Sequence, residues 1–366
     1  MNVLILIKTS SILFDERLKK EINSLLQMDV NSITAYVLED VKSNVFIDKV
    51  VFKNLYNFSK LSNNLFFRFF SIFYLLVYKL FFIRDSRYSL VWVHDPIMMF
   101  VIPFLSNSKV IWDLHELPPQ IVFKNKVLKR IFNYALKKSS KVIVANQSRG
   151  ELMKTEFSIH DYLVLENYPS NSNHKSLLSY RDDSFENWSH VDFFAYCQSA
   201  THPSRSFGSL AQACVDAKMP LLVVGEKNEV FKNVRSSVIG FDEYILVLGK
   251  KPSSVLPYYL SKSKFSFVFY TNRNLNNFYC APNRLYHSLN YGLPVIVGKN
   301  PTMATVVERH ECGIVVDSFG ENSRDIEVAI RRLKEDYKFY KKHAMELKDR
   351  FVWESQIDVI RKILMA

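Results

Sequence analysis

The chain has 366 residues, of which 48% are hydrophobic and 23% are charged, and these fractions are those of a folded globular protein. Its length excludes a single ordinary hydrophobic core and predicts two domains. The formal net charge of +12 favours anionic partners: phosphorylated ligands, an anionic bilayer or nucleic acid. The four cysteines occur singly, without metal-ligand spacing, and the short apolar run at the N-terminus lacks a cleavage site. We therefore expect reduced thiols in a cytoplasmic protein.

The first part of the chain alternates expected strands and helices. Residues 3–7 are a continuous apolar run, typical of a buried parallel strand, and a helix is expected to open at Asp15-Glu16-Arg17. The next strand is expected over residues 32–38. No G-x-G-x-x-G sequence is found there, so a dinucleotide-binding fingerprint is absent.

Two segments of the first half suit a membrane surface. Within the aromatic-rich stretch 58–83, the chain is almost long and apolar enough to span a bilayer, but Arg68 and Lys79 interrupt it. A core helix, a helix lying in the membrane interface and a span are the alternatives, and the first two are favoured because a span would split a domain. Residues 124–141 carry seven lysines and arginines and no acid, interleaved with apolar residues at helical spacing. They predict either a solvated face or an attachment to an anionic membrane.

Strands are expected over residues 89–93 and 109–112, and each is followed by a pair that consists of a histidine and an acid. The pairs are His94 with Asp95 and His115 with Glu116. Ligands gather at the carboxyl ends of the strands in open parallel sheets, so these side chains are candidate site residues. Taken singly, each histidine is equally well explained by capping or packing; together they favour a site.

The second half begins after a change in composition. Residues 169–190 are rich in serine, asparagine and charge, without periodicity, and are predicted to be an inter-domain linker. Strand and helix patterns then resume, with strands expected over residues 193–197 and 221–224. Strand–helix units on both sides of one linker predict two doubly wound α/β domains, over residues 1–168 and 191–352.

The segment from Asn276 to Gly298 has the most specific local pattern. A short helix is predicted to begin at Pro282-Asn283, because proline suits the first helical positions and asparagine can cap them, and to end at Gly292. The apolar residues 293–297 then predict a buried parallel strand. The start of the helix is an expected phosphate site, because its backbone N–H groups point outward and its dipole favours an anion.

Within this segment, P-N-R-L-Y-H-S-L-N-Y-G-L-P-V-I resembles the donor-sugar-nucleotide helix of GT-B glycosyltransferases, particularly the large retaining family 4. That family usually has P-N-K-L-F-E-Y-M-A-A-G-x-P-V-I here, or two glutamates eight positions apart. Arg284 stands for the family's lysine. The two glutamate positions fall on Tyr279 and His287, so both carboxylates are missing. The family also carries H-D-P and D-x-H-E segments like those at residues 94–96 and 113–116.

The resemblance implies a GT-B fold: two Rossmann-like α/β domains facing a cleft, with residues 353–366 crossing back to the first domain as a helix. The first domain would take the acceptor and the second would bind the nucleotide sugar. The family's G-R-L-x-x-x-K-G motif falls near residues 198–205, where Arg205 replaces the lysine and the leading glycine and arginine are lost. Arg205 and Arg284 are therefore the expected diphosphate clamp. The alternative, two surface arginines, is weaker for Arg284 than for Arg205.

The other expected site residues depend on the same resemblance. His115 is expected to contact the transferred sugar, and Asp95 or Glu116 to orient the acceptor hydroxyl or accept its proton. Glu226 is expected to bind the base or the ribose, or is a solvated loop acid. The remaining expected donor contacts are Tyr279, Asn283 and His287. No metal site and no cofactor are expected, since a helix N-terminus and a basic pair neutralise the leaving group in such enzymes.

We therefore expect a metal-independent, retaining glycosyltransferase that moves a sugar from a nucleotide-diphosphate sugar to a saccharide or lipid-linked acceptor. The expected setting is bacterial-type surface polysaccharide synthesis (lipopolysaccharide, O-antigen or capsule) by a cytoplasmic protein, peripheral on the inner face of the cell membrane. Two alternatives remain open: a GT-B sugar-nucleotide epimerase, and a non-catalytic GT-B partner protein, which the missing glutamates suggest. A nucleic-acid partner is disfavoured, because the basic residues cluster on one amphipathic helix without a nucleic-acid motif.

Overall fold

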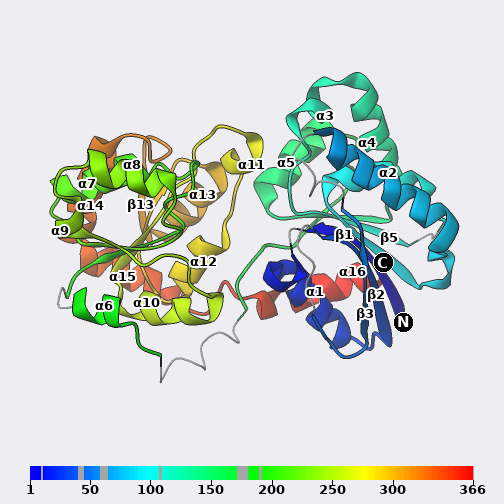
Figure 1. Ribbon diagram of the computed structural model, residues 1–366, viewed down its shortest axis with the longest axis horizontal. Coiled ribbons are helices and arrows are strands. Elements are labelled where there is room, and N and C mark those ends of the chain that lie inside the picture. Colours follow the sequence, from blue (N-terminus) through cyan, green and yellow to red (C-terminus); the bar gives the residue numbers. More distant parts are fainter. Residues whose placement is uncertain are drawn as a thin grey trace. The chain divides into compact units, whose positions relative to one another are not determined.

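The chain folds into two compact α/β units. The computed structural model describes residues 1–9, 11–39, 45–57, 65–106, 109–170, 180–188 and 192–365. The first unit consists of residues 1–166 and 356–366, and the second of residues 167–355. Each unit is a parallel β-sheet with helices on both faces, as the alternating strand and helix patterns predict (Figure 1).

The first unit has a seven-stranded sheet in the order β3-β2-β1-β4-β5-β6-β7, and every pair of neighbours is parallel. The strands are β1 (Asn2–Thr9), β2 (Ser32–Glu39), β3 (Val50–Leu55), β4 (Leu90–His94), β5 (Val110–Leu114), β6 (Lys141–Val144) and β7 (Leu163–Val164). The central strands β1 and β4 are apolar runs because both faces of the sheet are covered. The strand order reverses between them, which is where an open α/β sheet forms its ligand crevice.

Helices α1 (Glu16–Leu26) and α16 (Ile357–Met365) lie together on one face of this sheet. α1 begins where the sequence predicts, because the Asp15 carboxylate caps it by accepting a hydrogen bond from the Leu18 amide at 3.0 Å. The other helices are α2 (Leu65–Phe82), α3 (Gln120–Lys124), α4 (Lys126–Lys138) and α5 (Gln147–Glu156). The C-terminal helix thus belongs to the first unit, as the expected GT-B fold requires.

Helix α2 covers most of the aromatic-rich stretch, whose residues 58–64 lie outside the described part of the chain. Its Ile72 is buried, whereas Phe73 and Phe81 are 59% and 76% exposed. No helix among the described residues is long and apolar enough to cross a membrane. Lys79 does not reach outward from this helix: it is buried and pairs with Asp85 at 3.3 Å.

The second unit has a six-stranded parallel sheet in the order β10-β9-β8-β11-β12-β13, so its order reverses between β8 and β11. The strands are β8 (Ala195–Gln198), β9 (Leu221–Val224), β10 (Ile245–Val247), β11 (Phe265–Val268), β12 (Val295–Gly298) and β13 (Gly313–Val316). One face is covered by α7 (Phe207–Asp216), α8 (Glu229–Ser237), α9 (Phe241–Tyr244) and α14 (Ser323–Glu335). The other is covered by α6 (Asp183–Trp188), α10 (Leu256–Lys262) and α12 (Asn283–Asn290). The remaining helices are α11 (Leu275–Phe278), α13 (Pro301–His310) and α15 (Tyr337–Glu346).

The expected linker over residues 169–190 is only partly a linker. Residues 180–188 fold onto the second unit, where Phe185 of α6 is fully buried and its ring centre lies 5.3 Å from that of Tyr259. The charge that suggested a solvated segment is paired, since Asp182 accepts hydrogen bonds from Lys251 at 2.5 Å and from Tyr259 at 2.7 Å. Residues 171–179 and 189–190 lie outside the described residues.

Candidate active site

The predicted donor segment folds as a helix followed by a strand, but Pro282 is the N-cap residue of the helix and the expected asparagine cap is not formed. Helix α12 starts at Asn283 directly after Pro282, and Gly292, with φ of +61°, follows its end. The left-handed backbone there suits glycine. Leu285 and Leu289 are fully buried beneath the helix, and β12 follows as a buried strand.

Two arginines share one tyrosine ring beside this helix. Arg284 donates hydrogen bonds to the Gln198 carbonyl and to the Tyr270 hydroxyl, both at 2.7 Å. The guanidinium carbon of Arg205 lies 3.2 Å from the centre of the Tyr270 ring, and that of Arg284 lies 4.9 Å from it. Gln198 ends β8, and Tyr270 follows β11, so this pair sits at the carboxyl ends of the two strands between which the sheet order reverses.

The arginine pair carries positive charge that its surroundings leave unbalanced. Nε and Nη1 of Arg205 are buried and have no hydrogen-bond partner within the described part of the chain, and the same holds for Oδ1 of Asn283. Burial of the guanidinium and the charge of Arg284 lower the pKa of Arg205 to about 10. Buried donors without partners are costly unless a ligand satisfies them, so this arrangement suits a polyanion.

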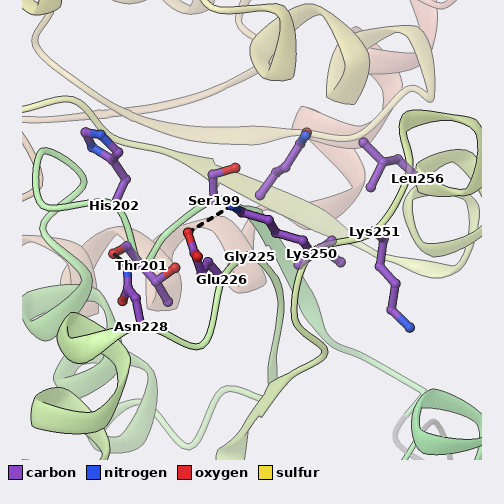
Figure 2. Close-up of a pocket in the computed structure, with 11 residues that line it drawn as sticks. Ser199, Thr201, His202, Gly225, Glu226, Asn228, Lys250, Lys251 and Leu256 are labelled. Carbon is purple, nitrogen blue, oxygen red and sulfur yellow. Dashed lines mark hydrogen bonds and ion pairs between the residues drawn. The ribbon is translucent and has the colours of Figure 1, made fainter. Parts of the chain in front are cut away.

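A cavity of about 280 Å³ opens next to this pair, at the ends of β8 and β9 (Figure 2). Its lining residues are Gln198, Ser199, Thr201, His202, Val224, Gly225, Glu226, Asn228, Lys250, Lys251 and Leu256. A Cβ added at Gly225 would lie 3.2 Å from the Ser199 Cα and from the Thr201 hydroxyl, so the glycine keeps this approach open. Burial, followed by the charges of Arg205 and Arg284, lowers the pKa of His202. The cavity therefore offers an imidazole that favours its neutral form, two hydroxyls, two amides, two lysines and the Glu226 carboxylate.

The expected donor residues fall in different places. Glu226 lines the large cavity, where it is exposed and pairs with Lys250 at 3.0 Å. Tyr279 ends α11 and packs on Phe278, with ring centres 4.8 Å apart. His287 lines a second, smaller cavity of about 20 Å³. His202, Asn228 and Lys251 were not predicted; their loops follow predicted strands, but no local pattern marks their side chains.

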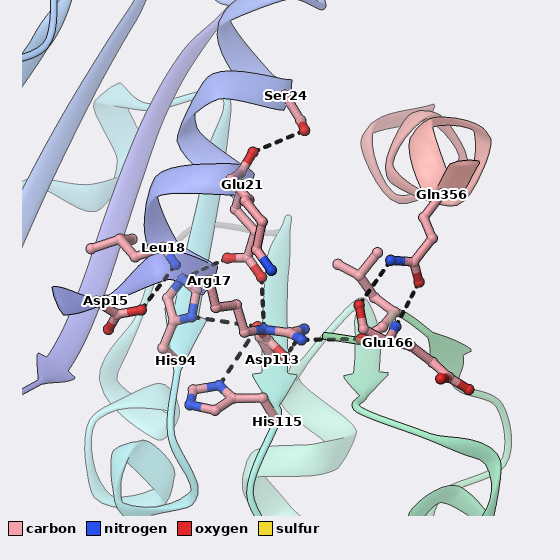
Figure 3. A network of polar contacts seen from close by, with 12 residues as sticks. Asp15, Arg17, Leu18, Glu21, Ser24, His94, Asp113, His115, Glu166 and Gln356 are labelled. Atoms are coloured by element: carbon pink, nitrogen blue, oxygen red, sulfur yellow. Dashed lines mark hydrogen bonds and ion pairs between the residues drawn. The ribbon is translucent and has the colours of Figure 1, made fainter. Parts of the chain in front are cut away.

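Two candidate residues of the first unit, His94 and His115, lie in a buried charge network (Figure 3). Asp113 of β5 is fully buried and accepts hydrogen bonds from Nε of Arg17 at 2.8 Å and from Nη2 at 2.9 Å. Arg17 also pairs with Glu21 at 2.9 Å. Nδ1 of His94 lies 3.4 Å from Asp113 Oδ2, and Nδ1 of His115 lies 3.7 Å from the same oxygen.

Asp95 and His115 form the partly exposed end of this network. Nε2 of His115 lies 3.5 Å from Oδ1 of Asp95, and the two side chains are 26% and 17% exposed. Burial raises the pKa of Asp95, which the charges of His115 and His94 oppose. Burial would lower the pKa of His115, but the adjacent Asp113 and the charge of Asp95 outweigh it and raise the pKa to about 9. Glu116 is exposed, and its predicted role stays a prediction.

Sequence reasoning paired the two histidines correctly, since their ring centres lie 6.0 Å apart. It did not assign a site role to Arg17, Glu21 or Asp113, although the D-x-R opening of α1 and the acid two residues before His115 were visible signals. Among the described residues, His94, Asp113 and His115 are the group whose ligand atoms lie close enough for a metal, all within 4.8 Å of one another. Arg17 already holds both oxygens of Asp113 and adds a positive charge, so this group is better suited to the arginine than to a metal ion.

Comparison with known proteins agrees with this architecture. Residues 214–351 match the family described as glucosyltransferase 3-like, C-terminal domain. HepE of Anabaena, in complex with UDP, is similar over 100% of both chains, with a TM-score of 0.75 and 14% identity. The chain has the GT-B fold. WaaG, a glycosyltransferase involved in lipopolysaccharide biosynthesis, is similar with a TM-score of 0.69 and 13% identity, over 98% of this chain and 99% of WaaG.

The GT-B fold also occurs outside transferases. A protein from Listeria monocytogenes named as a UDP-N-acetylglucosamine 2-epimerase is similar with a TM-score of 0.66 and 12% identity, over 99% of this chain and 94% of its own. No curated protein sequence matches the chain. The predicted GT-B fold is therefore confirmed, while membership of family 4 within it stays a prediction.

Proposed function

We propose that the protein is a glycosyltransferase that takes its sugar from a nucleotide-diphosphate donor. The observation that carries this proposal is the pair Arg205 and Arg284 around Tyr270, with buried donors that lack partners in the described part of the chain. A diphosphate would satisfy these donors, and the adjacent cavity would hold the nucleoside. HepE, which shares the fold, has been crystallised with UDP-glucose.

The chemistry assigned to the clamp is stabilisation of the leaving diphosphate. As the bond from the sugar to the diphosphate breaks, negative charge builds on the phosphate oxygens, and preorganised donors lower the barrier. Arg284 is fixed by its bonds to Gln198 and Tyr270, so it needs little rearrangement during the reaction. Two arginines supply this stabilisation without a divalent ion. Retention of anomeric configuration is proposed on the resemblance to family 4.

We assign acceptor chemistry to the first unit. Asp95, with its raised pKa, is a candidate base for the acceptor hydroxyl, and His115 is a candidate contact of the transferred sugar. We place the acceptor, a saccharide or a lipid-linked saccharide, at the inner face of a bacterial-type membrane during surface polysaccharide synthesis. WaaG, with the same fold, is a glycosyltransferase involved in lipopolysaccharide biosynthesis.

The proposed membrane surface combines α2 and α4. Both helices contact the 3-10 helix η4 (Pro96–Phe100). Exposed aromatic residues of α2, such as Phe81 and Phe82, would enter the headgroup region. The exposed cations of α4 would be attracted to anionic lipid.

A turnover assay with a panel of nucleotide-diphosphate sugars and mass-spectrometric detection tests the proposal. Transfer of a sugar to a saccharide or lipid-linked acceptor would support it. Conversion of the donor to an isomer without any acceptor would favour an epimerase. If no nucleotide diphosphate raises the melting temperature, a non-catalytic partner protein is favoured. The absence of both family glutamates, at the positions of Tyr279 and His287, suggests this alternative.

A further inference from the structure

The buried charge network of the first unit has an organisation that ordinary packing does not require. Arg17, Glu21, His94 and Asp113 are each at most 5% exposed. A buried ion pair contributes little net stability compared with apolar residues of similar size. The network is also directional: its buried part surrounds Asp113, and its partly exposed end is the His115 ring.

Both nitrogens of the His115 ring face a carboxylate. Nδ1 lies 3.7 Å from Asp113 and Nε2 lies 3.5 Å from Asp95. A ring with a carboxylate at each nitrogen is stabilised when both nitrogens carry protons. The other charged or titratable groups described around this site are Asp15, Arg17, Glu21, His94, Glu116 and Arg149, whose guanidinium donates to the His115 carbonyl.

The geometry fixes the Asp113 carboxylate and the backbone of Asp95 before any substrate arrives. Asp113 cannot rotate away, because Arg17 holds its two oxygens and donates a third hydrogen bond, from Nη1, to the Leu165 carbonyl at 3.0 Å. Asp95 has φ of 72° and ψ of 142°, a conformation that is rare for a residue with a side chain. Its carbonyl accepts a hydrogen bond from the buried Trp112 indole at 3.0 Å.

We propose that Arg17 and Asp113 are positioning residues. Arg17 fixes the Asp113 carboxylate, and Asp113 in turn fixes the orientation of His115 and, together with Asp95, holds its ring in the charged form during the reaction. His115 then presents a positively charged hydrogen-bond donor at the partly exposed end of the network, beside the Asp95 carboxyl group. The part of this proposal that concerns the reaction depends on the proposed glycosyltransferase function. The part that concerns the charge of His115 does not.

Titration of His115 by NMR of the histidine ring signals is the first test, with His115→Gln to assign its signal among the nine histidines. The expected midpoint in the wild type is about 9. Asp113→Asn removes one flanking carboxylate, so the midpoint is expected to fall below the ordinary value of 6.5, since burial then dominates. A wild-type midpoint near 6.5, or a midpoint that Asp113→Asn does not move, would overturn the proposal.

Asp85→Asn is the matched control. Asp85 is also a buried aspartate of the first unit, but it pairs with Lys79 and with Ser106. This variant should leave the His115 midpoint unchanged. If Asp113→Asn does not fold because Arg17 then has Glu21 as its remaining carboxylate partner, the double variant Arg17→Gln/Asp113→Asn removes both charges together. The charge of Arg17 lowers the pKa of His115 by less than Asp113 raises it, so the midpoint of the double variant is still expected to fall below that of the wild type.

Kinetics separate positioning from a structural role. Asp113→Asn is expected to lower kcat by about 10²-fold, the scale of losing one well-oriented group, and to change the KM for the donor by no more than about 2-fold. The pH at which kcat falls on the alkaline side of its pH profile should decrease together with the NMR midpoint. If this pH is unchanged despite a lowered midpoint, the role in the reaction is overturned. If the midpoint moves as expected but no donor is turned over, the network assignment stands and the proposed function fails.

Discussion

Replacing Arg205 with methionine should stabilise the fold and weaken donor binding. Burial and the charge of Arg284 lower the pKa of Arg205 from 12.5 to about 10. Because this pKa is lower in the folded chain, the unfolded chain binds more protons between these two values. The charged guanidinium therefore reduces stability at every pH below about 10, and the loss disappears as the pH rises toward 12.5.

The structure sets the size of this effect. A difference of one in pKa corresponds to about 1.4 kcal/mol, so the charged form costs about 3 kcal/mol before solvent screening is considered. Arg205 is half-buried, and the contact of its cation with the Tyr270 ring returns about 0.5–2 kcal/mol. Methionine retains the apolar contact with the ring. The free energy of unfolding is therefore expected to rise by about 1 kcal/mol in Arg205→Met.

Urea unfolding followed by circular dichroism measures the stability, and titration calorimetry with UDP measures the binding. UDP should bind Arg205→Met about 10-fold or more weakly, because charge-assisted hydrogen bonds to the diphosphate are lost. Arg235→Met is the control, since Arg235 is exposed on α8 of the same unit and pairs with Asp242 at 2.8 Å. It should neither stabilise the protein nor change UDP binding. A destabilised Arg205→Met that binds UDP like the wild type would refute the reasoning, because Arg205 would then be a structural residue.

Three further predictions follow from the proposed function. Arg284→Ala should lower turnover by about 10²-fold with the fold retained, and wild-type turnover in this variant would exclude Arg284 from the clamp. Turnover should survive EDTA, because arginines are proposed to neutralise the diphosphate; complete loss that manganese or magnesium restores would contradict this. Binding to anionic vesicles should weaken as salt rises and be lost when Arg130, Lys137 and Lys138 are changed to glutamate, with UDP binding intact. Co-sedimentation measures it, and equal binding to neutral and anionic vesicles would leave α4 an ordinary solvated face.

The sheets and the donor helix could be predicted because their signals are local. A buried parallel strand needs an apolar run. Residues 3–7 provide such a run within β1, and residues 293–297 provide one that overlaps most of β12. The end of α12 needs a residue that tolerates positive φ, and Gly292 provides it. Each of these requirements can be recognised within a few residues of the chain, and each element lies close to its expected position.

The buried polar contacts could not be predicted, because their partners are far apart in the sequence. Asp182 looked like a solvated linker acid until the fold placed Lys251 and Tyr259 beside it. Arg17 and Asp113 are 96 positions apart, so neither residue alone indicates that the other neutralises it. Composition describes a segment, whereas the burial of a charge is decided by what packs against it.

The places where local rules fail also indicate where the sites lie. Positive φ in a residue other than glycine occurs in ordinary turns of this chain, as at Asp29 and Lys218, so it does not mark a site by itself. At Asp95, however, φ of 72° coincides with a buried carboxylate oxygen, Oδ2, that lacks a hydrogen-bond partner in the described part of the chain. The same coincidence occurs at Ser206, next to Arg205 with its two unpartnered nitrogens. Strain and an unsatisfied polar group each cost free energy, and a fold retains both at one point when a bound ligand is to use them. Asp95 directly follows β4, and Ser206 lies in the segment after β8, so the two coincidences fall near the point of strand-order reversal in each sheet.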